Sequence, residues 1–189
     1  SINLVTPGSS LLTSTFKLPT ACMLILSLSV LMSLGCSDPR PAPPGVDIFT
    51  SAFKQNISDL EQHMGAGTDP NQWIPQGYDW AGASPLHIAV LVKNKDIIQL
   101  LIDNGADINI AARDSFGGTP LQWAAFWGIH DVTEFLVMLG ADISAPDRNV
   151  CTPLCASTVP NDFIGDDELK QFEKERTRIQ SYLKSKGAK

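Results

Sequence analysis

The side chains that most often carry out acid–base, metal or nucleophilic chemistry are few and scattered in this chain. Its three histidines are His63, His87 and His130, and they form no cluster at the spacing that zinc ligands adopt. The sequence contains no nucleophile elbow, phosphate-binding loop or H-E-x-x-H pair. We therefore expect no catalytic residues, no metal site and no cofactor, and we do not interpret the chain as an enzyme.

Two of the four cysteines lie close together near the carboxyl-terminal end. Cys151 and Cys155 are four residues apart and span the entry to a predicted helix. In an exported protein they could be oxidised, and their separation fits a disulfide. The other interpretation is a pair of small buried or half-buried thiols, and the sequence leaves both open.

Three consecutive acidic residues, Asp166, Asp167 and Glu168, stand at the start of an apolar pattern with helical spacing that reaches Lys184. The amino-terminal end of a helix favours negative charge, so this run is interpreted as part of the helix start. A cation site is the alternative.

The overall charge excludes two kinds of partner. The chain has 14 basic and 20 acidic residues, for a formal net charge of -6. An acidic chain does not attract nucleic-acid phosphates or anionic lipid by charge, so we expect no nucleic-acid partner. Residues 1–35 contain no Asp or Glu and a single basic residue, Lys17, which sets them apart as a separate functional piece.

This first piece has the pattern of an export signal. Ala21 to Leu34 is a run of 14 residues without charge, preceded by Lys17. A helix that spans a bilayer needs about 20 apolar residues, whereas the core of a signal peptide is shorter. We predict a signal peptide over residues 1–35. An ordinary cleaved signal or a retained anchor are the alternatives to the more specific interpretation that follows.

The end of the apolar run resembles the processing site of bacterial lipoproteins. It reads Ser33-Leu34-Gly35-Cys36-Ser37, with a small residue directly before the Cys, and with Ser33 where Leu is usual. The resemblance implies that Cys36 is lipidated, for example with palmitate, and becomes the mature amino terminus. Residues 36–46 are rich in proline, which is typical of an extended tether. We expect an outer-membrane lipoprotein of the bacterial cell envelope that faces the periplasm or the cell surface and contacts the membrane through its lipid only.

Downstream of the tether, the sequence repeats with a period of 33 to 35 residues. The recurring tripeptides are Ser84-Pro85-Leu86, Thr119-Pro120-Leu121 and Thr152-Pro153-Leu154, and Gly-Ala recurs at 105, 140 and 187. Ser or Thr before Pro is typical of a helix start, and Gly after an apolar run is typical of a helix end. Each unit therefore contains helices that must stack on neighbouring units to bury their apolar faces.

The repeats resemble the ankyrin family, whose pattern is D-x-x-G-x-T-P-L-H-x-A followed by V-x-x-L-L and G-A-D-x-N. Residues 79–109 and 114–144 follow it closely, and His87 occupies the family's His position, where it serves local hydrogen bonding. The resemblance implies an all-α repeat solenoid of about four stacked repeats, with β-hairpin fingers and degraded capping repeats at both ends. The expected repeats are residues 47–78 (cap and long finger), 79–113, 114–146 and 147–189 (terminal repeat with an insertion around Val159 to Asp167), so that the domain covers 47–189.

Ankyrin repeats bind partners on a concave face formed by the fingers and the first helices. Transferring the family's variable positions to this chain predicts partner-binding residues at Trp80, Leu91, Val92, Phe116, Phe126, Trp127 and Arg148. The long finger from Asn71 to Asp79 adds Trp73 and Tyr78, which could contact a partner or fold back over the cap. Aromatic side chains dominate binding energy at interfaces. The other possibility is that some rings pack inside the solenoid, and Trp123 is assigned to the core.

The two histidines outside the His87 position, His63 and His130, are placed near exposed positions of second helices.

The whole pattern predicts a non-catalytic module that is exported, tethered to the envelope and bound to a protein of unknown identity. An immunity protein that inhibits a toxin and a structural envelope component are the alternative functions.

Overall fold

The computed structural model describes residues 41–189. The predicted signal peptide, Cys36 and the first part of the tether lie outside the described residues. The described part of the chain is helical throughout, with loops between the helices and no β-strand. Within it, no helix combines the length and the apolar character that crossing a bilayer requires.

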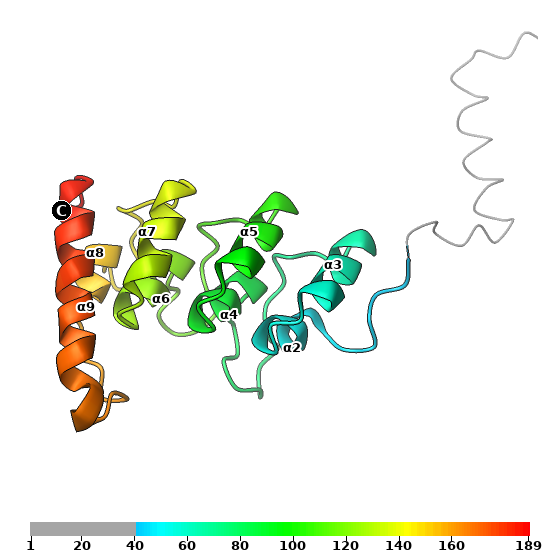
Figure 1. The fold of residues 1–189 in the computed structure, drawn as a ribbon, viewed down its shortest axis with the longest axis horizontal. Coiled ribbons are helices and arrows are strands. Elements are labelled where there is room, and N and C mark those ends of the chain that lie inside the picture. Colours follow the sequence, from blue (N-terminus) through cyan, green and yellow to red (C-terminus); the bar gives the residue numbers. More distant parts are fainter. Residues whose placement is uncertain (1–40) are drawn as a thin grey trace, which may run out of the picture. The chain divides into compact units, whose positions relative to one another are not determined.

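The helices form pairs that stack side by side in chain order (Figure 1). Each predicted repeat contains one pair. The pairs are α2 (Ile48–Phe53) with α3 (Ile57–Gly65), α4 (Pro85–Leu91) with α5 (Lys95–Asp103), α6 (Pro120–Phe126) with α7 (His130–Met138), and α8 (Pro153–Ala156) with α9 (Asp166–Ser185). Contacts between α2 and α4, α4 and α6, and α6 and α8 join the first helices of neighbouring repeats. The predicted all-α repeat solenoid is confirmed.

The repeated tripeptides begin the first helices for a local reason. Ser84, Thr119 and Thr152 each accept a hydrogen bond from the amide three residues later. Each is followed by a proline, which lacks the N–H group that the first helical turn leaves unpaired.

Asparagine side chains join successive repeats. The side-chain oxygen of Asn71 accepts a hydrogen bond from the amide of Asp107 (2.7 Å), and that of Asn109 accepts one from the amide of Asp142 (2.8 Å). Both bonds run from the loop after one second helix to the same loop of the next repeat. They therefore hold the repeat spacing from outside the apolar core.

The core runs through the stack. Its largest fully buried members are Ile48, Leu60, Leu86, Val90, Ile97, Ile98, Leu101, Leu121, Leu136, Ile179 and Leu183. Because neighbouring pairs share this apolar surface, the stability of one repeat depends on the next.

The terminal repeat differs from the others in the proportions of its parts. Helix α8 has four residues and α9 has twenty, with the loop from 157 to 165 between them. A smaller apolar cluster of Ala125, Ala156, Ile179 and Leu183 packs α9 against α6 and α8. The long final helix thus covers the last face of the stack.

The predicted β-hairpin fingers are wrong for the described residues. In the long finger, backbone hydrogen bonds across the hairpin form only at Ile74. The Ile74 amide donates to the Ala83 carbonyl, and the Gly82 amide donates to the Ile74 carbonyl (both 2.8 Å). Pro75 has no N–H to continue such a ladder. The fingers are also bonded to each other, through Arg113 N–H to Gly82 O (2.8 Å) and Arg148 N–H to Phe116 O (2.9 Å).

Candidate protein-binding face

Five aromatic rings form a connected row along the first-helix side of the stack. The aromatic row consists of Trp80, Trp123, Phe126, Trp127 and Phe163. The distance between ring centroids is 5.9 Å from Trp80 to Trp123 and 6.1 Å from Trp80 to Trp127. It is 5.3 Å from Trp127 to Phe126 and 6.0 Å from Trp127 to Phe163. Three elements supply the rings: a finger, helix α6 with its carboxyl-terminal cap, and the loop before α9.

The members of the aromatic row differ in exposure. Trp80 is 44% exposed and Phe163 is 80% exposed, whereas the other three rings are half-buried. The half-buried rings support the exposed ones from below. Rigid aromatic groups held in this way lose little conformational freedom on binding, which is the property of interface anchors.

The backbone of Trp80 is also unusual. Its φ angle is 60°, in the left-handed region that non-glycine residues rarely adopt. Such a conformation costs on the order of 1–3 kcal/mol and persists only where the surroundings impose it. The contacts of the indole with Trp123 and Trp127 are part of those surroundings.

Two predicted contact residues are partly structural. Phe126 packs against the apolar cluster under α9, and Trp127 packs against the main core. Trp123, which is predicted to lie in the core, is half-buried and packs against the main core, and its ring lies 4.7 Å from that of His87. Leu91 and Val92 lie half-buried at the carboxyl-terminal end of α4. Removing any of these side chains would therefore affect packing as well as binding.

The fingers after α5 and α7 each carry one further predicted contact residue. Phe116 is exposed at the tip of the finger after α5, and Arg148 of the following finger is exposed beside it. The Arg148 guanidinium donates to the carbonyl of Asp114 and lies against Gly117, where an added Cβ would meet its Cγ at 3.0 Å. Arg148 is thus held in place and keeps other donors for a partner.

The long finger divides into a docked part and an exposed part. The Trp73 indole N–H donates to the Ala111 carbonyl (3.1 Å), and the Arg113 guanidinium stands 3.4 Å from the centre of the ring. Trp73 therefore ties the finger to the next repeat. Tyr78, by contrast, is 71% exposed.

Sequence reasoning missed Phe163 and the residue that positions its loop. Arg176 of α9 is almost fully buried, and it donates to the carbonyls of Ser157 (2.5 Å) and Val159 (2.6 Å). These bonds hold the loop that brings Phe163 to Trp127. The signal was available, because Arg176 stands among Phe172, Ile179 and Leu183 at the spacing of the buried face of α9.

His63 of α3 and His130 of α7 each lie next to a polar side chain of their own repeat. His63 was placed at an exposed position, which is wrong: it is 3% exposed, and its Nδ1 lies 3.2 Å from the Thr68 hydroxyl. It follows Leu60 by three residues and so shares the buried face of α3. His130 is half-buried, 3.6 Å from a carboxylate oxygen of Glu134. No three His, Cys, Asp or Glu side chains of the described residues are grouped as metal ligands would be.

His87 is fully buried and completes the cap of α4. Its Nδ1 accepts from the Ser84 amide (3.2 Å), and its Nε2 lies 3.0 Å from the Gly118 carbonyl, to which it donates. Burial lowers the pKa of His87 to about 4, although the hydrogen bond to Gly118 and the charge of Asp114 act in the opposite direction. The neutral ring therefore links the α4 cap to the next finger.

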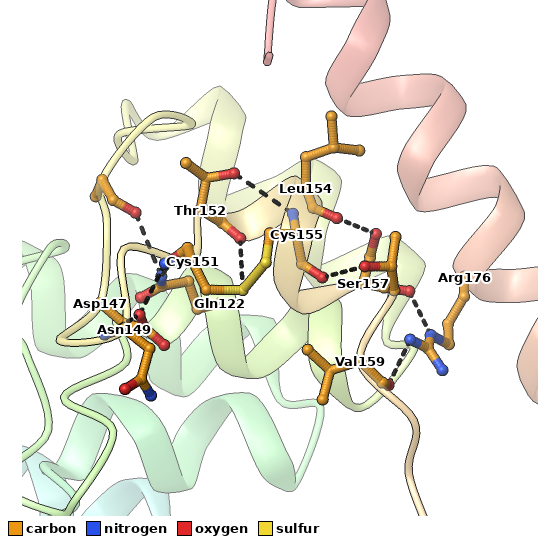
Figure 2. The surroundings of a disulfide bond; sticks show 12 residues. Gln122, Asp147, Asn149, Cys151, Thr152, Leu154, Cys155, Ser157, Val159 and Arg176 are labelled. Carbon is orange, nitrogen blue, oxygen red and sulfur yellow. Dashed lines mark hydrogen bonds between the residues drawn. A yellow bond between two sulfur atoms is a disulfide. The ribbon is translucent and has the colours of Figure 1, made fainter.

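Cys151 and Cys155 form a disulfide at the start of α8 (Figure 2). Their Cα atoms are 5.3 Å apart. The carbonyl of Cys151 also accepts from the side-chain amide of Gln122. The bridge thus fixes the last finger to α8. Of the two interpretations that the sequence left open, a disulfide or two free thiols, the structure has the disulfide.

A stack of helix pairs with protruding fingers defines a helical-repeat protein. The family model for ankyrin repeats matches residues 49–147 in three copies, which is just over half of the chain. The chain belongs to the ankyrin-repeat family. Ankyrin repeats are in general non-catalytic modules for protein–protein interaction.

Three relatives illustrate how far the similarity extends. Protein phosphatase 1 regulatory subunit 27 of Homo sapiens is 37% identical over 93 residues, which cover 49% of this chain and 54% of the relative. Protein phosphatase 1 regulatory subunit 12A of Mus musculus is 40% identical over 124 residues, covering 62% and 12%. An ankyrin repeat protein of Borreliella burgdorferi is 30% identical over 103 residues, covering 54% and 45%. The chain spans about half the length of the first of these relatives and less of the others.

Proposed function

We propose that this protein is a non-catalytic interaction module that is exported, tethered to the bacterial envelope and bound to a protein partner through the aromatic row. The observation that supports it best is the placement of Trp80 and Phe163. Both are exposed, and both rest on Trp127. Large exposed rings favour aggregation, so a cluster of them is typical of a surface that a partner covers.

Two observations support export. The first is the Cys151–Cys155 disulfide, because disulfides persist in oxidising compartments such as the periplasm and are rare in the cytosol. The second is the Gly35-Cys36 sequence after the apolar run. Lipid on Cys36 would hold the repeats at a membrane surface of the envelope, most consistently the outer membrane.

The names of two relatives support a regulatory role for the binding. Both are regulatory subunits of a phosphatase, and the similarity lies in a segment of about 90 to 120 residues that overlaps the repeats. A repeat surface can be changed without changing the fold, so the partner of this chain need not be a phosphatase.

Affinity capture tests the binding role. The full chain is immobilised and exposed to an envelope extract, in parallel with the Trp80→Ala/Phe163→Ala double variant and with Met138→Ala. Met138 is a large exposed apolar residue on α7, away from the aromatic row, and serves as the matched control. We expect one or more proteins to be captured by wild type and Met138→Ala but not by the double variant. Capture by none of the three would favour a structural envelope component over a binding protein. Equal capture by all three would mean that the partner binds elsewhere than on the aromatic row.

Mass spectrometry of the mature protein tests the tether. We expect an amino-terminal Cys36 that carries lipid, and we expect a Cys36→Ala variant to lose the lipid while the repeats stay folded. An unmodified Cys36, or a mature chain that retains the residues before it, would contradict a lipoprotein.

A further inference from the structure

A groove lies between the amino-terminal cap repeat and the long finger. It has a volume of about 680 Å³, and residues of α2, the finger and α4 line it. Its apolar lining is formed by Phe49, Phe53, Ile74, Tyr78, Trp80 and Ile88. Pockets for small molecules span about 300–1,000 Å³, so the groove has room for a few side chains but not for a whole domain.

The charge of the groove is one-sided. Its lining residues include Asp47 and Asp79 and no Lys, Arg or His. Asp79 is exposed, and no hydrogen bond or ion pair of its carboxylate occurs among the described residues. Asp47 accepts from the Thr50 amide and hydroxyl (both 2.8 Å). Burial alone would raise the pKa of Asp47, but these hydrogen bonds outweigh burial and lower it, so the carboxylate stays charged at neutral pH.

Another groove of this protein has a different balance of charge. It has a volume of about 510 Å³ and contains Arg113 and Arg148 with a single acidic residue, Asp107. The two grooves therefore do not accept the same chemistry, and the acidic character between the cap repeat and the long finger is a local property.

Aromatic rings and carboxylates together favour one type of occupant. The faces of Trp, Tyr and Phe attract Lys and Arg cations, and nearby carboxylates pair with them. The aliphatic stems of Lys and Arg also pack on apolar surface while the charged end reaches an acid. A neutral or acidic segment would leave the two carboxylates without compensation when water is expelled.

We propose that this groove binds a short segment of the protein partner that presents a Lys or Arg next to an aliphatic or aromatic residue. This inference rests on the proposed binding function and specifies the chemistry that one part of the face recognises. The cation would lie between Asp79 and Asp47, with its stem and its apolar neighbour on Tyr78 and Trp80. Trp80 also belongs to the aromatic row, so the groove continues the row toward the cap repeat.

A phage-displayed random peptide library, selected on the full chain, tests the proposal. The enriched peptides are then synthesised, and their affinity is measured by fluorescence anisotropy for wild type and four variants. Tyr78→Ala removes an exposed ring of the groove, and Asp79→Lys reverses its accessible charge. Glu61→Gln removes an exposed acid of α3 outside the groove. Phe163→Ala changes the aromatic row but not the groove.

We expect enriched peptides to pair a basic residue with an apolar one and to bind more weakly as salt is raised. Tyr78→Ala and Asp79→Lys should each weaken them at least about tenfold, whereas Glu61→Gln and Phe163→Ala should stay within about twofold. Peptides without basic residues, indifference to Asp79→Lys, or no enrichment would overturn the proposal. A selection without any enriched peptide is also the result expected if the chain's own residues filled the groove. Failure here, with capture of a partner that still depends on Phe163, would leave the proposed function standing.

Discussion

His87 and Gln122 occupy the same position in successive repeats and form equivalent bonds. His87 accepts from the amide of Ser84 and donates to the carbonyl of Gly118, while Gln122 accepts from the amide of Thr119 and donates to the carbonyl of Cys151. Each side chain thus closes its own helix cap and holds the next finger. In the terminal repeat the same position is Cys155, whose disulfide to Cys151 ties α8 to the finger of its own repeat.

The burial of His87 predicts acid sensitivity. The pKa of His87 is lowered to about 4 from the ordinary value of 6.5, so between these pH values the unfolded chain binds more protons than the folded one. The stabilisation is fully present above about pH 6.5 and is lost as the pH falls toward about 4, by roughly 3 kcal/mol at most. His87→Gln, which copies Gln122, should fold and lose this part of the pH dependence.

Denaturant titrations at pH 7, 5.5 and 4.5 provide the measurement. Met138→Ala is the control, since Met138 is exposed and carries no titratable group, and it should keep the wild-type dependence on pH. An equal loss of stability in acid for wild type and His87→Gln would mean that other groups cause it.

Leu101 should contribute strongly to the free energy of unfolding, because it is fully buried between neighbouring helices. Leu101→Ala should lower that free energy by about 2–5 kcal/mol, whereas Met138→Ala, at an exposed site, should change it by less than about 0.5 kcal/mol. Chemical denaturation measures both. Similar effects for the two variants would contradict the assignment of the core.

Val150 occupies a position that the two preceding repeats fill with glycine. Its φ angle is 61°, and those of Gly82 and Gly117 are 86° and 70°. A β-branched residue is strained in this region, and the Val150 side chain is exposed, so little packing would be lost with it. Val150→Gly should raise the free energy of unfolding by about 0.5–1 kcal/mol after allowing for the entropy of glycine.

Val150→Ala is the control for that change, because it removes the β-branch but keeps a Cβ. It should recover only part of the gain. If the melting temperature of Val150→Gly is lower than that of wild type, the turn does not carry the inferred strain.

The disulfide should be present in protein recovered from the envelope. Alkylation under denaturing conditions should leave Cys151 and Cys155 unmodified until a reductant is added, as peptide mass spectrometry can show. The free energy of unfolding of the Cys151→Ser/Cys155→Ser variant should be lower than that of wild type by up to about 2 kcal/mol, which is the loop-closure contribution expected for so short a loop. Full alkylation without reductant would show two free thiols and remove one support for export.

The repeats were predictable because their period is encoded locally. Ser84 and Thr119 start helices by contacts within four residues, and the tripeptides that contain them recur at 35 residues. The family pattern then supplied Trp80 and Trp127 as surface candidates. Local rules were sufficient wherever a residue had an equivalent in a neighbouring repeat.

The features that were missed depend on contacts between distant or unique segments. Phe163 lies in a loop without an equivalent in other repeats, and its position depends on Arg176 of α9. Trp73 is docked by Ala111 and Arg113 of another repeat, 38 and 40 residues away. His63 lies in a degenerate cap whose family pattern is too weak to place it.

Phe163 and Trp80 contribute the exposed rings of the aromatic row, and the affinity of the captured partner for single variants tests the central claim most directly. Isothermal titration calorimetry should give a Kd at least about thirtyfold weaker for Trp80→Ala and for Phe163→Ala, since truncating an anchor typically costs at least about 2 kcal/mol. Circular dichroism should show wild-type helix content for both, and Met138→Ala should bind as wild type does. Unchanged Kd values for both folded variants would contradict the account.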